Sequence, residues 1–461
     1  MSNEPLVLYF GAVQRPEFYS GLLDSGVALG VLRDSDSVHT LEPEEFALVE
    51  RTRFADGADA VARCIEEIGR RWRIEAVLNV DETLVQLWAE VCARLGLPAM
   101  SGEAAAAVRS KSEMRRRFAE HIGEHASARS AVVTSEEQVL AFAAGTGYPV
   151  VLKPGNLWGS YFVSRCENAA ELTAAYRELA ATLPEFSAGQ RVTDTPAEIL
   201  VEEFLTGTNH SVECLVLDER VWTTPVVDVV TGTDLGGTDF HHFARVTATR
   251  LTPAERERMR ALAADAVRAL GIRRGLAHVE FVHGPAGPRL IEVAGRPGAN
   301  RAPLLREAYG INLIAGYRDV LRGVEPSVEP VRDGAAAVVT PYPERAGTLV
   351  EYAGLERVHA LASTAQVDVY KHPGDLVQPR HEGAGSPLRI ELRADSPGQL
   401  LADLDELRGL CEDLFVVREA REVQDGGARE AAPAGAGLAG TAGAGLAGTD
   451  PESAGCPEAG G

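Results

Sequence analysis

The sequence predicts a mixed fold in which an N-terminal α/β domain is followed by α+β modules. Two observations lead to this prediction. Over about the first hundred residues, apolar strand-like runs alternate with helical periodicity, which is the pattern of a small parallel sheet. After about residue 130, short strand-like runs and two helices replace this regular alternation. The 461 residues suffice for about two to four packed modules.

The N-terminal domain is expected to hold three buried strands and two helices. Val61, Ile65, Ile68 and Trp72 recur at helical spacing and mark the first helix. Gly96 is a typical residue after the end of the second. We predict strands at residues 6–10, 27–32 and 76–80, and helices at residues 58–72 and 83–95.

The middle of the chain carries clear helix-start signals. Thr134 and Glu137 predict a capping box and a helix that ends near residue 144. Thr252, Pro253 and Glu255 predict the start of a longer helix that ends near residue 270. Strands are predicted at residues 148–153, 197–204 and 211–217, then at 276–282 and 288–293 as a hairpin, and a further α/β module at residues 335–420.

Composition excludes several classes of protein. The net charge is -22, and no dense basic stretch offers phosphates a partner, so we expect no nucleic-acid ligand. The nearest basic run, residues 115–117, lies between Glu113 and Glu120, and we interpret it as a solvated helix face. No apolar run reaches the roughly 18 residues of a membrane helix. Six scattered cysteines and the lack of a signal-peptide pattern favour a cytoplasmic protein.

Two motif matches are set aside. A GxGxxG match at residues 435–440 lies in an Ala/Gly-rich tail, where residues 434–441 are repeated directly by residues 442–449. Such a composition cannot bury enough apolar surface to fold, so residues 422–461 are predicted to be disordered. An HxxEH match at residues 121–125 contains Gly123, which weakens the helix that a zinc site of this kind needs, and no third ligand is evident.

Two stretches suit nucleotide binding. Lys153 leaves a predicted strand into a loop of small residues that includes Ser160. The lysine charge, the loop N–H groups and the Ser160 hydroxyl could hold ATP phosphates, although an exposed lysine at a strand end is common. Glu202 and Glu203, in ILVEEFL, could offer backbone groups and a carboxylate to adenine or ribose, or could simply solubilise a strand edge.

A third stretch suits a metal. Alternation places His278 and Glu280 on one face of a strand, and the hairpin would bring Glu292 beside Glu280. Adjacent carboxylates repel unless a cation joins them, and oxygen ligands together with ATP phosphates suit Mg²⁺. Arg296 follows four residues later and could stabilise charge on a transferring phosphoryl group or a tetrahedral intermediate. The alternative is a solvent-facing hairpin.

Taken in order, Lys111, YPVVLKP, VEEFLTG, HVEF and LIEVAGRPG resemble the ATP-grasp superfamily, and within it the L-amino-acid ligase branch. The resemblance runs from about residue 77 to residue 417. It implies an N-terminal Rossmann-like (pre-ATP-grasp) domain, an ATP-grasp fold of two α+β subdomains, and a C-terminal ligase lobe. The corresponding boundaries are residues 1–105, 106–325 with a lid at about 111–200, and 326–421.

The resemblance also implies roles for individual residues. Lys111 and Lys153 would be the two ATP lysines, with residues 156–163, Ser160 among them, covering the phosphates. Glu280 and Glu292 would bind Mg²⁺, or Mn²⁺ in its place. Arg296 would hold the acyl phosphate and the oxyanion. The remaining roles are the adenine linker for Glu202, Glu203, Phe204 and Leu205, the ribose contact for Asn209, a catalytic and substrate-side role for His242, and the substrate pocket for Asn300.

Two departures from the family pattern stand out. Many ATP-grasp enzymes have an asparagine two residues after the second glutamate, where this chain has Ala294. The amino-acid ligase branch often has a small residue there, so Ala294 supports that branch. The phosphate-covering loop is poor in glycine and contains Leu157 and Phe162.

The implied function is an ADP-forming ligase that joins a carboxylate to an amine through an acyl phosphate, with an amino acid as one substrate. A role in specialised metabolism and a homodimer are compatible with this reading. Two alternatives remain: an ATP-grasp carboxylase that activates bicarbonate, and a non-catalytic nucleotide-binding scaffold. Ala294 and the lack of a biotinylation-like AMKM segment count against the first, and the retained lysines, glutamates and Arg296 against the second.

The tail predicts a simple experiment. Because the repeat in residues 434–449 has no hydrophobic face, deleting residues 425–461 should leave activity and melting temperature nearly unchanged. A large loss of either, measured by turnover and thermal unfolding, would show that the tail packs on the enzyme or acts in catalysis.

Overall fold

The computed structural model describes residues 4–11, 13, 16–37, 44–157, 162–189, 197–237, 240–379 and 385–418. The tail prediction and the predicted role of Ser160 lie outside these residues. Within them, none of the helices has the length and apolar character required to cross a bilayer. The mixture of a parallel α/β sheet with antiparallel sheets confirms the predicted fold class.

A four-stranded parallel sheet forms the N-terminal part, in the order β3-β2-β1-β4. The predicted strands and helices are present here, and the strand β3 was missed. Trp88 is fully buried and donates from Nε1 to the carbonyl of Val77 (3.0 Å). The elements are β1 (Pro5–Phe10), η1 (Pro16–Phe18), η2 (Ser20–Ser25), β2 (Ala28–Asp34), β3 (Leu48–Thr52), η3 (Phe54–Asp56), α1 (Ala58–Arg71), β4 (Arg73–Asn79), η4 (Glu82–Leu84) and α2 (Val85–Leu95).

Two helices, α3 and α4, and a small antiparallel sheet with α5 and α6 follow, and the strand order of this sheet is β5-β8-β6-β7. The predicted capping box was one residue out of place: Ser135 is the N-cap and accepts from the backbone N–H of Gln138, and Thr134 lies outside the helix. This part comprises α3 (Gly102–Ala107), α4 (Lys111–His121), η5 (Glu124–Ala126), β5 (Ser130–Val133), α5 (Glu136–Thr146), β6 (Val150–Pro154), β7 (Ser164–Cys166), α6 (Ala169–Gly189) and β8 (Ile199–Glu203).

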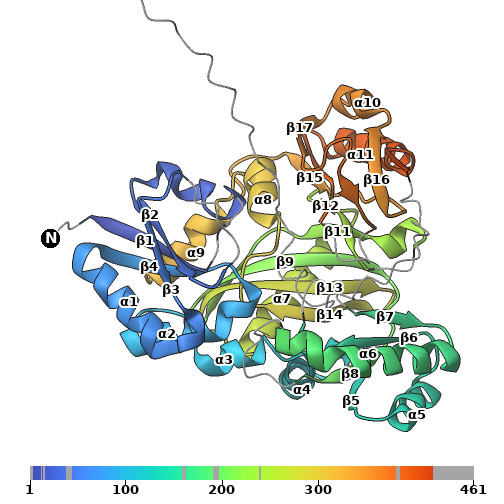
Figure 1. Ribbon diagram of the computed structural model, residues 1–461, viewed down its shortest axis with the longest axis horizontal. Helices are drawn as coiled ribbons and strands as arrows, with labels where there is room; N and C mark the ends of the chain where they lie inside the picture. The colour runs from blue at the N-terminus through green and yellow to red at the C-terminus, as the bar shows by residue number, and fades with distance from the viewer. Residues whose placement is uncertain are drawn as a thin grey trace, which may run out of the picture.

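The largest sheet runs through the centre of the molecule, in the order β14-β13-β9-β11-β12-β15-β19-β17, with β10 on β9 (Figure 1). The predicted hairpin and the Thr252–Glu255 capping box are both present. Its first part comprises β9 (Thr208–Leu217), β10 (Arg220–Thr223), β11 (Val227–Thr231), η6 (Gly232–Leu235), β12 (His242–Val246), α7 (Pro253–Ala269), β13 (Arg274–Gly284), β14 (Gly287–Ala294), α8 (Arg301–Tyr309) and α9 (Leu313–Leu321).

The C-terminal part continues the same sheet, because β15 pairs with β12. The large sheet therefore crosses the predicted boundary at residue 325. A second sheet, β18-β16-β20, stands beside it. These elements are β15 (Ala335–Val339), β16 (Gly347–Tyr352), α10 (Leu355–Ala360), β17 (Thr364–Val369), β18 (Leu376–Val377), β19 (Leu388–Ala394), α11 (Pro397–Glu412) and β20 (Phe415–Arg418).

Candidate active site

A cavity lies between the small antiparallel sheet and the β13–β14 end of the large sheet. Figure 1 shows the small sheet, in green, beside these strands. Most of the predicted nucleotide and metal residues line this cavity, although they are spread through the sequence from residue 111 to residue 292. They are Lys111, Lys153, Glu202, Glu203, Phe204, Leu205, Asn209, His242, Glu280 and Glu292.

Lys153, at the end of β6, is held in a buried ion-pair cluster. Its Nζ lies 2.5 Å from Oε2 of Glu202, and Arg115 approaches the other carboxylate oxygen through Nε at 2.9 Å. Burial lowers the pKa of Lys153 to about 8 despite the attraction of Glu202. Burial would raise the pKa of Glu202, but Arg115 and Lys153 lower it to about 2. A phosphate that enters the cavity would therefore meet the positive groups of Lys153 and Arg115, with the carboxylate of Glu202 between them.

Arg115 corrects the sequence-based interpretation of the basic run. The run was interpreted as a solvated helix face, and Arg116 fits that description because it bonds Glu113 and Glu120 at the surface. Arg115, by contrast, is 6% exposed and lines the cavity. The helix α4 turns neighbouring side chains by about 100°, so consecutive arginines need not share a face. The sequence alone could not show which of these arginines is buried in the cavity wall and which is exposed.

Lys111, the first residue of α4, links the cavity floor to the loop after β6. Its Nζ donates to the carbonyl of Leu157 (2.6 Å) and lies 3.1 Å from Oε1 of Glu292. Its backbone N–H donates to the carbonyl of Gly155. The ammonium group thus stands between the start of the phosphate-covering loop and a predicted metal ligand, a place from which it could neutralise phosphate charge.

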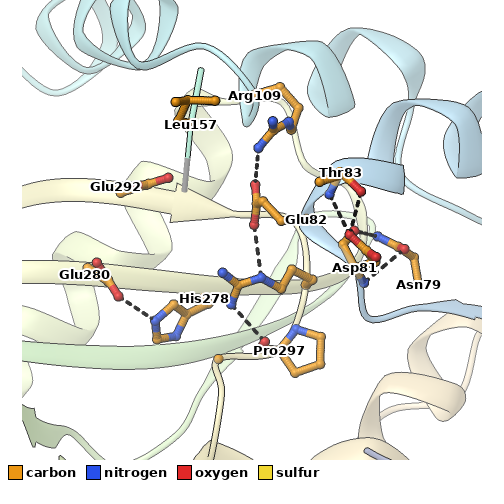
Figure 2. A network of polar contacts seen from close by, with 12 residues as sticks. Asn79, Asp81, Glu82, Thr83, Arg109, Leu157, His278, Glu280, Glu292 and Pro297 are labelled. Carbon is orange, nitrogen blue, oxygen red and sulfur yellow. Dashed lines mark hydrogen bonds and ion pairs between the residues drawn. The ribbon is translucent and has the colours of Figure 1, made fainter. Parts of the chain in front are cut away.

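Glu280 and Glu292 are direct cross-strand partners in the β13–β14 hairpin. Nε2 of His278 bonds Oε1 of Glu280 at 3.0 Å (Figure 2). Burial would raise the pKa of Glu280, but this hydrogen bond and the nearby positive charges hold it well below its usual range. Glu280 is therefore a carboxylate at any physiological pH. The alternative of a solvent-facing hairpin is wrong, because both side chains line the cavity.

These two carboxylates fit a divalent cation. Within the described ranges, His, Cys, Asp and Glu nowhere gather in the groups of three that could enclose a metal, the HxxEH stretch included. Mg²⁺ does not need such a cage, because one or two carboxylates complemented by phosphate oxygens and water complete its shell. Glu280 and Glu292 would hold the ion, which would supply charge neutralisation to phosphate oxygens.

Arg296 is anchored by a carboxylate from the N-terminal domain. Its Nε lies 3.0 Å from Oε2 of Glu82, whose other oxygen meets Nη1 of Arg109 at 3.0 Å. Figure 2 shows Glu82 directly below Arg109, at the end of the strand that carries Glu292. Arg109 also donates to the carbonyl of Asn156. One buried carboxylate thus connects Arg296 with the base of the phosphate-covering loop.

The turn that carries Glu82 is fixed by side-chain hydrogen bonds of Asn79 and Asp81. Asp81 caps η4 and accepts from the N–H (2.8 Å) and the hydroxyl (2.7 Å) of Thr83. Asn79, the last residue of β4, donates to the carbonyl of Asp81 (Figure 2). The carboxyl end of a strand in a parallel sheet is the usual place for a ligand-facing group. Glu82 and Arg109 were missed by the sequence analysis, because no family motif or local pattern marks them.

His242 lines the cavity as a neutral imidazole. Burial lowers its pKa to about 3, against the attraction of Glu280 and with the help of Arg245 and Arg301. At neutral pH it can accept or donate one hydrogen bond but carries no charge. This placement is compatible with the predicted substrate-side role, which stays a prediction.

The remaining predicted residues lie in three kinds of place. The carboxylate of Glu203 is already paired with Arg129 and Arg289, so a contact with ribose or adenine would have to compete. Asn300 is 4% exposed, its Oδ1 accepts from Arg389 (3.1 Å), and it is absent from the residues that line the cavity. Its predicted role in the substrate pocket stays a prediction, and Ser160 lies outside the described residues.

The low pKa of Lys153 predicts pH-dependent nucleotide binding. If ADP requires the ammonium form, affinity should fall as pH rises through about 8, by roughly tenfold between pH 7 and 9, because each unit above the pKa removes a factor of ten of that form. Lys153→Arg should abolish the slope, since guanidinium stays charged. Isothermal titration calorimetry measures both, with Lys371→Arg as the control. Equal wild-type affinity at the two pH values would contradict the assignment.

Comparison with known proteins bears on the domain type and the fold of the chain. Residues 146–302 match the ATP-grasp domain model. An uncharacterised protein y4rH of Sinorhizobium fredii is 27% identical over 332 residues, which cover 72% of this chain and 65% of that protein. Alanine–anticapsin ligase of Bacillus subtilis is 25% identical over 279 residues, 57% of each chain. The chain thus spans less than two thirds of the length of these relatives.

Among solved structures, an L-amino acid ligase from Bacillus licheniformis superposes with a TM-score of 0.74 and 19% identity. The match covers 91% of this chain and all of that one. At this identity, the likeness shows the fold alone. Together, the two findings lead to one conclusion: residues 146–302 match an ATP-grasp domain, and the chain has a fold similar to that of an L-amino acid ligase.

Proposed function

We propose that the chain is an ATP-dependent, ADP-forming ligase that joins a carboxylate to an amine, with an amino acid as at least one substrate. The observation that carries the proposal is the cavity in which Lys111 contacts Glu292 beside Glu280, while Lys153 faces the same space. Paired carboxylates and two ammonium groups are what a metal-bound triphosphate needs. The names of the ligase relatives support an amino-acid substrate.

The reaction would have two steps. A carboxylate oxygen of the first substrate attacks the γ-phosphorus of ATP, the bond from that phosphorus to ADP breaks, and an acyl phosphate forms. The amine nitrogen then attacks the acyl carbon and forms the C–N bond, while the C–O bond to phosphate breaks and the nitrogen loses a proton. Each step develops charge on oxygen, which fixed positive groups can stabilise without reorganising.

The chain's own residues have distinct tasks in this scheme. Lys111 and Lys153 neutralise phosphate charge, and Mg²⁺, when bound by Glu280 and Glu292, adds to that neutralisation. Arg296 is held in place by Glu82, beside Glu280 and Glu292, with which its charge interacts. From there its guanidinium group can meet the acyl phosphate and the oxyanion with two parallel donors. Neutral His242 can hydrogen-bond a substrate without repelling the amine.

A carboxylase acting on bicarbonate is the second candidate. It would share the phosphate and metal residues, so the cavity alone does not separate the two. Ala294 counts against it, since it is an apolar residue, 3% exposed, at the position of the asparagine ligand. A non-catalytic scaffold would not need the buried cluster of Lys153, Arg115 and Glu202, because such charges are costly to desolvate.

A substrate matrix distinguishes these functions. The full chain with Mg-ATP should release phosphate when given particular pairs of amino acids, and mass spectrometry should show a product smaller by one water than the pair. Phosphate release that depends on bicarbonate would favour the carboxylase. Release under neither condition, in protein shown to bind ADP, would favour the scaffold.

Replacing a metal carboxylate should abolish turnover and spare the fold. Glu292→Ala removes one of the two oxygen ligands and leaves Lys111 without its partner, so Mg-ATP turnover should fall below detection. Glu75→Ala is the control, since Glu75 is a similarly shielded carboxylate that pairs with Arg73 and Arg322 elsewhere. Product formation at the wild-type rate in the Glu292 variant would refute the metal assignment.

Arg296→Lys tests the oxyanion role. Lysine keeps the charge but cannot place two parallel donors, so product formation should fall by roughly 10²–10³-fold with nearly unchanged ATP affinity. If Arg296 serves only to pair with Glu82 and stabilise the turn, the melting temperature of the variant should fall together with its turnover rate. Arg322→Lys, which perturbs the pairing of Arg322 with Glu75 in the N-terminal domain, gives the matched control. Normal turnover and substrate choice would remove Arg296 from the mechanism.

A further inference from the structure

The carboxylate of Glu213 is also buried, close to the proposed metal residues, and it does not line the cavity. Glu213 lies in the middle of β9, 1% exposed. The cross-strand register aligns Glu213 with His278 and Ala294, two positions along the strands from the aligned set Ser211, Glu280 and Glu292, so that both sets point to the same face. Cross-strand partners share a face of the sheet, so Glu213 lies on the face that carries the metal carboxylates. Figure 1 shows β9, β13 and β14 side by side in the centre of the molecule.

The two oxygens of Glu213 reach two different parts of the site. Oε1 lies 2.5 Å from Nδ1 of His278, whose Nε2 in turn bonds Glu280 at 3.0 Å. Oε2 accepts from the backbone N–H of Gly298 (3.1 Å). Gly298 belongs to the turn of residues 295–300, which we call the Arg296 turn. One carboxylate therefore bonds both the support of a metal ligand and the turn that carries the oxyanion group.

The packing of the turn shows that this link is tight. A Cβ atom on Gly298 would lie 2.4 Å from Nδ1 of His278, which no side chain can tolerate. The turn therefore rests directly on the imidazole ring. Directly after the turn, Nε of Arg301, the first residue of α8, donates to the hydroxyl of Ser211, two residues before Glu213 on the same strand. Strand β9 thus holds the Arg296 turn at Gly298 and the residue that follows the turn.

The charge on Glu213 also needs an explanation. Removing a carboxylate from water is unfavourable unless it is paired and hydrogen-bonded, and an apolar residue would fill the middle of β9 without this cost. Residues that hydrogen-bond a metal ligand orient that ligand, and their removal weakens metal binding although they do not touch the metal. His278 has the contacts of such a partner of Glu280, and Glu213 holds His278 in turn.

We propose that Glu213 is a positioning residue that holds Glu280 and the Arg296 turn in one fixed arrangement, through His278 on one side and Gly298 on the other. This inference rests on the proposed metal role of Glu280. It couples the phosphate-binding half of the site to the half that would stabilise the oxyanion, so a change at Glu213 alters both at once.

The experiment compares Glu213→Gln with the wild-type full chain. Glutamine keeps an oxygen for Gly298 but no charge for His278. At saturating ADP, the Mn²⁺ dissociation constant, measured by electron paramagnetic resonance of free Mn²⁺, should rise by roughly 10–100-fold. ADP affinity without metal should change by less than about twofold. Asp403→Asn removes a buried carboxylate that accepts from the N–H of Ser363 in the C-terminal lobe, and it should leave both values unchanged.

Two results would overturn the inference. One is a Glu213→Gln protein with the wild-type Mn²⁺ affinity. The other is equal weakening of ADP binding with and without metal, which would mean that Glu213 only supports the fold. Since both are binding measurements, they stand even if no amino-acid pair gives product, and the substrate matrix tests that separately.

Gly298→Ala provides a second variant that leaves the carboxylate in place. Its Cβ should force the Arg296 turn off His278, so turnover should fall while the Mn²⁺ constant changes less than in Glu213→Gln. If Glu213→Gln does not fold, Gly298→Ala tests the inference instead. Normal turnover in Gly298→Ala would show that the contact between the Arg296 turn and His278 does not hold the turn in its active position.

Discussion

The repulsion between two adjacent carboxylates is the constraint on which the site depends. Glu280 and Glu292 face each other across the β13–β14 hairpin, and the register of that hairpin leaves them no other arrangement. Lys111 partly balances Glu292 and His278 balances Glu280. The remaining demand for positive charge is what a divalent cation would satisfy, and the cation would complete its shell with phosphate oxygens. The cavity is thus electrostatically prepared for its ligand, and the hydrogen bond from His278 helps to hold the pKa of Glu280 well below its usual range.

The choice between lysine and arginine supports this view. Of the 45 basic residues in the chain, only Lys111, Lys153 and Lys371 are lysines. Two of these three line the cavity. An ammonium group is compact and meets a phosphate as a point charge, whereas guanidinium is a planar fork suited to carboxylates and acyl phosphates. The arginines around the cavity follow the second pattern, since Arg115, Arg109 and Arg296 each meet a carboxylate.

Much of the fold was accessible from the sequence, because local signals agree with the global structure. The capping box at Thr252, the buried strands and the β13–β14 hairpin were predicted from patterning, and the hairpin then placed Glu280 opposite Glu292. Glu213 and Glu82 were not predicted. Each is important through partners 27 or more positions away, such as Arg109 for Glu82 and His278 for Glu213. A long-range pairing of this kind leaves no local periodicity in the sequence.

The central claim is that the carboxylate pair holds a metal-bound phosphate in this cavity. Its most direct test is a crystal structure of the full chain with Mn²⁺ and ADP, with the metal located by anomalous scattering. The account predicts one anomalous peak between the carboxylates of Glu280 and Glu292, with the diphosphate beside Lys111 and Lys153. A metal ligated elsewhere, or a diphosphate remote from both lysines, would contradict it.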